Sequence, residues 1–181
     1  MTCWWTICPR AEFDLVHMRL LLAWLADREL GLRRLIAALK PGGWLVAEEM
    51  DFISVAPDPH LDAGAARTFT RVAQAHTAVL AERNGFDHSY GRRLVGDLTD
   101  AGLREIGCEG RASMWQGAGP GGAIWRLTLE QLREPLITSG RVTATEVDEA
   151  IALSGDPRFR VQSPITMAAW GRRPAATSPG S

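Results

Sequence analysis

The sequence lacks the features that mark several classes of protein. Its 181 residues include three cysteines, Cys3, Cys8 and Cys108, and no CxxC pair. An odd cysteine count without paired spacing indicates free thiols in a reducing compartment, so we expect a cytoplasmic protein without disulfides. No apolar run approaches the roughly 20 residues that a membrane-spanning helix needs. The short apolar start has no preceding positive charge and does not resemble a signal peptide.

Excess charge and metal-binding patterns are also missing. Twenty Lys and Arg residues against 21 Asp and Glu residues give a net charge of −1. This balance gives no electrostatic reason to expect nucleic acid or a membrane surface as a partner. The sequence has no HExxH motif, and no ligand spacing links its four histidines, His17, His60, His76 and His88. We therefore predict no metal site.

Residues 13–52 carry the clearest pattern that is present. The apolar run Phe13–Met18 predicts a strand covered on both faces. Asp27 can cap a following helix, whose apolar positions are Leu32, Leu35, Ile36 and Leu39. Pro41-Gly42-Gly43 is expected to end that helix and turn the chain into a strand at Trp44–Met50. Strand, helix and strand with short links predict a parallel βαβ unit.

The rest of the chain predicts further helices and two more strands. The expected helices are Leu61–Arg83, Gly91–Ala101, Ala123–Ile137 and a last one that the capping box Thr143–Glu146 opens. The expected strands are Ile106–Trp115 and Ser163–Gly171. We expect an irregular lead at 1–12, a folded body at 13–173 and a disordered tail at 174–181.

Three stretches together resemble one enzyme family. They are FDLVHMR at 13–19, LRRLIAALKPGGWLVAEE at 32–49, and the segment at 90–103 that begins Tyr90-Gly91-Arg92-Arg93-Leu94. They resemble class I S-adenosylmethionine-dependent methyltransferases, in particular bacterial members that act on small molecules. The resemblance implies transfer of a methyl group from S-adenosylmethionine to a small-molecule acceptor.

The family resemblance also implies a fold. The family's sheet has the strand order 3-2-1-4-5-7-6, with strand seven antiparallel. Phe13–Met18 would be strand four and Trp44–Met50 strand five, while Ile106–Trp115 and Ser163–Gly171 would be strands six and seven. We therefore predict an α/β fold, a partial Rossmann-like methyltransferase sheet of strands four, five, seven and six with flanking helices.

The first three strands of the family have no counterpart in this sequence. The family's glycine-rich turn after strand one and its acidic residue after strand two, which hold the cofactor, cannot be placed. We expect an N-terminally truncated domain that is incomplete for cofactor binding. The alternative is a catalytically inactive remnant or an interaction module.

The resemblance places candidate site residues at two strand ends. His17, Met18 and Arg19, after strand four, would border the methionine end of the cofactor. Glu49, Asp51 and Phe52, after strand five, would face the methyl acceptor. Both positions suit open α/β sheets, whose ligands bind beyond the carboxyl ends of strands.

The chemistry of these residues leaves alternatives open. His17 is the best candidate for a general base, because the pKa of an imidazole lies near neutrality. A histidine with a purely structural role at a strand end is the alternative. Glu48, Glu49 and Asp51 cluster at the end of strand five, and alternation places Glu49 and Asp51 on one face of the strand and Glu48 on the other. Those carboxylates could accept a proton from the methyl acceptor, or they could mark a solvated strand end.

Two other features are not predicted to carry the chemistry. The segment Gly117–Gly122 matches GxGxxG, but no strand that ends in an acid follows about 20 residues later, so it is predicted to be a flexible loop after strand six, near the acceptor pocket, and not a dinucleotide site. His76 lies on the apolar stripe of a helix and is expected to be a core or interface histidine.

The predicted strand Phe13–Met18 would have a bare outer edge. Bare apolar edges recruit other strands. We therefore expect self-association, or pairing with a complementing chain, through Phe13–Met18.

Overall fold

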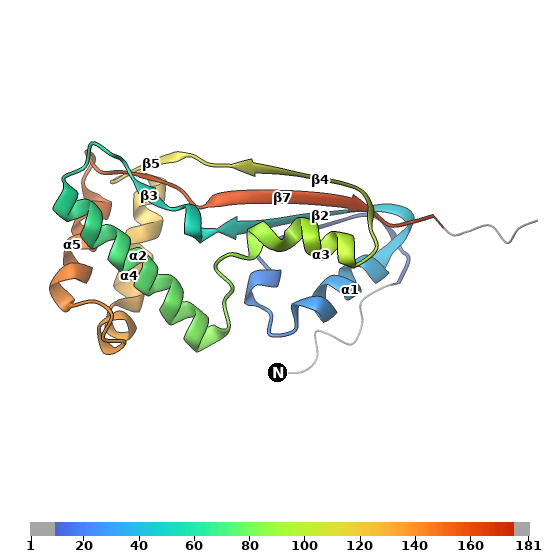
Figure 1. The fold of residues 1–181 in the computed structure, drawn as a ribbon, viewed down its shortest axis with the longest axis horizontal. Coiled ribbons are helices and arrows are strands. Elements are labelled where there is room, and N and C mark those ends of the chain that lie inside the picture. The colour runs from blue at the N-terminus through green and yellow to red at the C-terminus, as the bar shows by residue number, and fades with distance from the viewer. Residues whose placement is uncertain (1–9, 176–181) are drawn as a thin grey trace, which may run out of the picture. The chain divides into compact units, whose positions relative to one another are not determined.

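The computed structural model describes residues 10–175, which divide into two compact units (Figure 1). The sheet unit contains residues 10–51, 89–110 and 166–175, and the helical unit contains residues 52–88 and 111–165. The predicted lead at 1–12 and tail at 174–181 lie mostly outside the described residues, as do Cys3 and Cys8. Cys108 is a half-buried free thiol.

Four strands form the sheet of the sheet unit. They are β1 (Phe13–Arg19), β2 (Leu39–Asp51), β4 (Arg104–Arg111) and β7 (Ile165–Arg172), and their order across the sheet is β1-β2-β7-β4. β1 and β2 are parallel, whereas the arrow of β7 in Figure 1 runs opposite to those of β2 and β4. This arrangement confirms the predicted order of strands four, five, seven and six.

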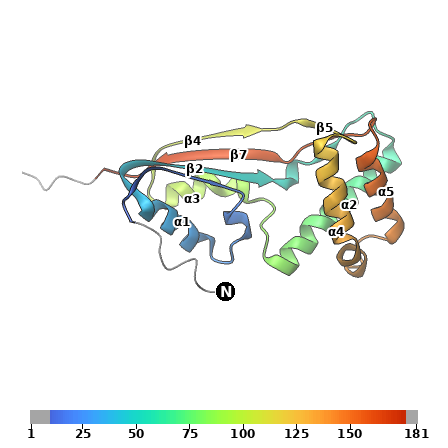
Figure 2. The same ribbon diagram turned by 180° about the vertical axis from the view of Figure 1, so that it is seen from behind.

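Two helices lie on one face of this sheet (Figures 1 and 2). The helix α1 (Arg28–Ala38) leads into β2, and α3 (Leu94–Asp100) follows the 3-10 turn η3 (Tyr90–Arg93). Asp27 caps α1 as predicted, because its Oδ1 accepts the backbone N–H of Leu30 at 2.8 Å. A second 3-10 turn, η1 (Leu22–Trp24), connects β1 to α1.

The Pro-Gly-Gly sequence does not form the predicted turn ahead of the strand. β2 begins at Leu39, directly after α1, and runs through Pro41-Gly42-Gly43. Proline disfavours a helical conformation in the residue before it, so the chain is already extended there. Between the pairs Phe13–Leu39 and Leu15–Trp44, β1 advances by two residues and β2 by five, which leaves a bulge of three extra residues.

Glycine is required at this bulge for two reasons. Gly42 has a φ of +83°, a conformation that costs glycine little. A Cβ on Gly43 would lie 3.0–3.1 Å from the carbonyl oxygens of Lys40, Phe13 and Asp14. The bulge brings Lys40 Nζ within 2.8 Å of Asp14 Oδ2, so the lysine pairs across the two strands.

Three helices and a small sheet form the helical unit, seen from behind in Figure 2. The helices are α2 (Ala63–Asn84), α4 (Pro120–Thr138) and α5 (Ala144–Gly155). The strands β3 (Ala56–Pro57), β5 (Met114–Gln116) and β6 (Arg160–Gln162) pair antiparallel in the order β3-β6-β5, and the 3-10 turn η2 (Phe52–Ser54) precedes β3.

The helix ends follow from local sequence. Asp62 Oδ1 accepts the backbone N–H groups of Gly64 and Ala65, which opens α2, and Gly85 ends α2 with a φ of +69°. The predicted capping box is present at α5, where the side chains and backbones of Thr143 and Glu146 hydrogen-bond each other. The apolar faces of the helices enclose a core that includes Phe69, Val72, Leu129, Leu136, Val147 and Phe159.

The predicted strand Ile106–Trp115 is two strands in different sheets, β4 and β5. The break falls at Ala112-Ser113, where the Ser113 N–H donates to Ser163 Oγ at 3.0 Å instead of to a neighbouring strand. The predicted strand Ser163–Gly171 begins later, at Ile165. Pro164 lacks the N–H that a ladder needs and so separates β6 from β7. The segments 104–116 and 160–172 therefore each contribute one strand to both sheets.

No helix within residues 10–175 is both long enough and apolar enough to span a bilayer.

Candidate functional site

The carboxyl ends of β1 and β2 lie at the same edge of the sheet because the two strands are parallel. The register pairs His17 with Val46 and Arg19 with Glu48. His17 Nε2 lies 3.1 Å from Glu48 Oε1, and Arg19 Nε lies 3.5 Å from Glu48 Oε2. Glu48 is therefore held between an imidazole and a guanidinium. Its place in the site follows from the strand register, which periodicity alone does not give.

The predicted cofactor-bordering residues divide between the two faces of β1. The side chains of His17 and Arg19 are 50% and 60% exposed, whereas Met18 is only 5% exposed and belongs to the core. His17 and Arg19 thus carry exposed polar groups at this edge, and the buried Met18 fixes the strand that carries them.

A strained residue follows immediately. Leu20 has a φ of +53°, which is rare for a bulky side chain. Its N–H donates to the Glu48 carbonyl at 2.9 Å, which holds the strained turn against β2. Backbone strain of this kind clusters at ligand-binding positions and is retained only where surrounding contacts enforce it.

The side chain of Glu49 makes hydrogen bonds that hold this turn in place. It is only 1% exposed, and its Oε1 accepts the backbone N–H groups of Leu21, Leu22 and Ala23 at 2.9, 2.6 and 3.2 Å. Burial raises the pKa of Glu49, although these three donors and the Arg28 charge act in the opposite direction. Glu49 therefore joins the end of β2 to the chain that leaves β1.

Asp51 binds the next segment of the sheet unit. It is 2% exposed, and its Oδ2 lies 2.8 Å from Nε of Arg92 in η3. η3 packs tightly on the end of β2, since a Cβ on Gly91 would lie 3.0 Å from the Glu49 carbonyl oxygen. Glu49 and Asp51 share one face of β2, as alternation predicts, and each holds a different connecting segment.

Phe52 begins the helical unit. Its backbone N–H donates to the His88 carbonyl at 2.9 Å. Its ring centroid lies 6.0 Å from that of His76 and 5.6 Å from that of Phe86, and its side chain lines a cavity of about 250 Å³. The three predicted acceptor-facing residues therefore have different local partners.

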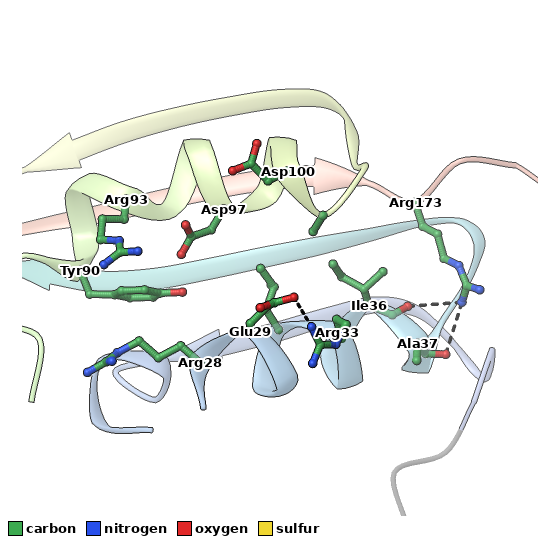
Figure 3. Close-up of a pocket in the computed structure, with 12 residues that line it drawn as sticks. Arg28, Glu29, Arg33, Ile36, Ala37, Tyr90, Arg93, Asp97, Asp100 and Arg173 are labelled. Atoms are coloured by element: carbon green, nitrogen blue, oxygen red, sulfur yellow. Dashed lines mark hydrogen bonds and ion pairs between the residues drawn. The ribbon is translucent and has the colours of Figure 1, made fainter. Parts of the chain in front are cut away.

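A larger cavity of about 760 Å³ lies in the sheet unit between α1 and α3 (Figure 3). At one end of the cavity, the buried ring of Tyr90 has the guanidinium carbons of Arg28 and Arg93 each 5.9 Å from its centroid (Figure 3). Burial and a hydrogen bond to Asp97 raise the pKa of Tyr90, so its hydroxyl stays protonated at neutral pH. The Arg28 contact joins α1 to η3, the turn that precedes α3.

The polar groups at the other end of this cavity bond to the protein itself. Arg173 donates to the carbonyl oxygens of Ile36 and Ala37 at 3.3 Å each, and also to that of Leu39. These bonds satisfy the last carbonyls of α1, and Arg33 pairs with Glu29. We assign the cavity to the packing of α1 and α3. The sequence patterns did not identify Tyr90 or Arg173, whose partners are distant in the chain.

The GxGxxG segment serves packing within the helical unit. A Cβ on Gly117 would lie 2.1 Å from the Asp156 carbonyl oxygen, and one on Gly122 would lie 2.5 Å from the Ser154 carbonyl oxygen. These glycines let the start of α4 approach the end of α5. The space that a phosphate or ribose would need is filled by backbone.

The resemblance implies that His17 and Arg19, at the sheet edge, border the cofactor, and this assignment stays a prediction. The glycines at 117–122 are closed to the cofactor, and no group of three His, Cys, Asp or Glu side chains within residues 10–175 could hold a metal. We therefore assign no chemical step through the cofactor to this chain alone.

The fold and the sheet edge define the class of protein as an α/β protein with part of a Rossmann-like sheet. No family model matches the chain. It is 31% identical over 102 residues to methyltransferase str2 of Strobilurus tenacellus, a match that covers 53% of this chain and 35% of that protein. With methyltransferase str3 of the same organism the identity is 29% over 99 residues, covering 54% and 34%. The match thus spans about a third of the length of these curated relatives.

Solved structures give similar but partial overlays. Phosphoethanolamine N-methyltransferase 2 of Haemonchus contortus, in complex with S-adenosylhomocysteine, matches 92% of this chain and 35% of its own, with 12% identity and a TM-score of 0.41. The YcgJ protein of Bacillus subtilis matches 93% of this chain and 67% of its own, with 10% identity and a TM-score of 0.48. The curated sequence relatives are methyltransferases, which agrees with the predicted resemblance to a methyltransferase family.

Proposed function

We propose that this chain is part of an S-adenosylmethionine-dependent methyltransferase that acts on a small molecule. The observation that carries the proposal is the sheet order β1-β2-β7-β4, in which the last strand of the chain inserts between two earlier ones. That order is the one implied by the sequence resemblance, and the curated relatives support the same family.

In this proposal the sheet edge positions the reactants. Methyl transfer is an in-line displacement, for which holding the two groups in line is the main contribution of the protein. His17, Met18 and Arg19 would border the cofactor, while Glu49, Asp51 and Phe52 would face the acceptor. Because the Glu48 carboxylate lies 3.1 Å from His17 Nε2, it would orient the imidazole as a general base.

The glycine-rich half of the cofactor site would come from polypeptide outside this chain, either a preceding segment of a longer protein or a second chain. β1 offers the surface for it, because within the described sheet it lies at an edge and pairs with β2. Phe13 and Leu15 are 44% and 57% exposed on this strand. An exposed apolar edge can bind another strand.

The same edge favours a second candidate function. A catalytically inactive remnant or interaction module would use β1 for self-association or for pairing with a complementing chain. A cytoplasmic location stays a prediction from the cysteine content for either function.

Calorimetric titration with S-adenosylmethionine distinguishes these functions. We expect the chain alone to bind more weakly than about 1 mM, or some −4 kcal/mol. The chain extended by any in-frame upstream sequence that encodes a strand and a glycine-rich turn should bind more tightly. Tight binding by the chain alone would contradict the incomplete site. If the upstream DNA encodes no such segment and the chain does not bind, the interaction module is favoured.

A further inference from the structure

The cavity of about 250 Å³ in the helical unit is lined by apolar, aromatic and polar side chains. η2, β3, α2 and α4 contribute to it. Its apolar wall includes Phe52, Ile53, Val55, Phe69, Ala73 and Trp125, and its polar groups are Thr70, Gln74, Thr77 and His88. None of the described lining residues is Asp, Glu, Lys or Arg. An ion in this cavity would therefore find no carboxylate, ammonium or guanidinium group among them as a partner.

The aromatic part of this wall continues into the core. The Phe69 and Trp125 rings meet edge to face, with centroids 5.2 Å apart. Trp125 also meets the His76 ring at 5.4 Å, and His76 lies 6.0 Å from Phe52. Edge-to-face contacts of this kind fix ring orientations. The cavity thus lies beside an ordered aromatic cluster, a surface that suits another planar ring.

Two buried nitrogen atoms of this cluster have no hydrogen-bond partner within residues 10–175. They are Nε1 of Trp125 and Nδ1 of His76, and each residue is only 3% exposed. Leaving a buried polar group unpaired costs about 1–3 kcal/mol, so such groups are uncommon unless something else supplies the partner. Burial lowers the pKa of His76 to about 4, so its imidazole is neutral at physiological pH. The cluster therefore offers polar atoms without charge.

The polar lining groups can also bind oxygen. The hydroxyls of Thr70 and Thr77 donate to the carbonyl oxygens of Ala66 and Gln74 at 2.8 and 2.9 Å. Their oxygens keep acceptor capacity for a hydroxyl of a ligand. The side-chain amide of Gln74 can both donate and accept.

We propose that this cavity binds a small, neutral molecule with one planar ring and a hydroxyl or carbonyl oxygen. Its volume lies just below the range of about 300–1,000 Å³ that is usual for drug-sized ligands, which suits a single ring. A charged ligand is disfavoured because an unpaired charge is costly to bury. This ligand is the methyl acceptor if the proposed function holds, and the assignment as acceptor rests on that function.

The test follows the indole N–H signal of Trp125 by NMR in the full chain, without S-adenosylmethionine. The chain has seven tryptophans, so the Trp125→Phe variant assigns the signal. The probes are phenol, benzyl alcohol and acetophenone, with benzoate and benzylammonium as charged compounds of similar size. We expect saturable shifts with at least one neutral probe, and at least tenfold weaker binding of both ions.

Variants on α2 locate the binding site. Ala73 lines the cavity, so Ala73→Leu should fill it and weaken binding at least tenfold. Ala78→Leu is the matched control, because Ala78 is half-buried on the same helix and does not line the cavity. If Ala73→Leu does not fold, Val55→Phe fills the cavity from a different segment.

Three results would overturn the inference: no saturable shift with any neutral probe, equal binding of the ions, or unchanged binding in the filled variants. Because the cofactor is absent from this experiment, its failure differs from failure of the proposed function. If the chain binds a neutral ring compound but its N-terminally extended form does not bind S-adenosylmethionine, the cavity assignment stands and the proposed methyltransferase function is rejected.

Discussion

The Glu49 side chain binds the backbone of Leu22, which lies 27 residues earlier in the chain, at 2.6 Å. The same oxygen accepts the N–H groups of Leu21 and Ala23, so one carboxyl group satisfies three donors of η1. This contact connects the ends of β1 and β2, the two strands that carry the candidate site. A residue expected to face the methyl acceptor thus has a clear architectural role, and its removal should affect folding before chemistry.

Replacing Glu49 by alanine should destabilise the sheet unit. The change leaves three N–H groups near a buried position without their acceptor, and we expect a loss of about 2–4 kcal/mol in the free energy of unfolding. Urea denaturation measures it. Glu48→Ala is the matched control, because Glu48 pairs with exposed His17 and Arg19 and such pairs contribute less than about 1 kcal/mol. Equal effects of the two variants would refute the architectural role.

The pH dependence of the free energy of unfolding should also show the contribution of the Glu49 carboxyl group. Burial raises the pKa of Glu49 in the folded state above its ordinary value of 4.5. The folded state then binds the proton more tightly than the unfolded state does, so this group contributes stability at low pH. That contribution is lost as the pH rises from about 4.5 through the raised pKa. Denaturation at successive pH values should show this fall in the wild type and not in Glu49→Gln.

Close packing at Gly122 gives a prediction for the helical unit. An alanine Cβ there would lie 2.5 Å from the Ser154 carbonyl oxygen and 2.7 Å from the Gly117 Cα. Because backbone cannot move aside easily, Gly122→Ala should cost about 1–3 kcal/mol of stability. Gly155→Ala is the control, since a Cβ at Gly155 meets nothing within 4 Å. A thermal melt that shows no difference between the two would contradict the packing role of the GxGxxG glycines.

Much of the fold could be predicted because local signals and the family resemblance agree. The capping residues Asp27 and Thr143 and the strand at Phe13–Met18 are elements that the structure confirms. The prediction that this strand is covered on both faces is wrong, because Phe13 and Leu15 are exposed and only Met18 is buried. The prediction of a single strand at Ile106–Trp115 was wrong, because the chain passes from one sheet to the other at Ser113. Sequence periodicity indicates that residues are extended, but it does not indicate which strand they pair with. Pro41-Gly42-Gly43 likewise signals irregular backbone, but the bulge within β2 depends on pairing with β1.

The candidate site was less accessible to sequence reasoning. Alternation correctly placed Glu49 and Asp51 on the same face, but their partners, Leu22 and Arg92, follow from tertiary structure. The cavity beside Phe52 depends on α2 and α4, which are distant in sequence. Roles for His17, Met18, Arg19, Glu49, Asp51 and Phe52 in ligand binding stay predictions until ligands are measured.

The exposed edge of β1 gives a last prediction, on association. Leu15 is 57% exposed on this strand, and a lysine there would place a charge on the apolar edge, a common protection against strand pairing. We expect the wild-type chain to self-associate as its concentration rises, and Leu15→Lys to shift this association to at least tenfold higher concentration. Sedimentation equilibrium across a concentration series measures the change. Val95→Lys is the control, because Val95 is 42% exposed on α3, a helix outside the β1 edge, and its replacement should leave association unchanged. A wild-type chain that stays monomeric throughout, or equal effects of the two lysines, would show that β1 is not the contact.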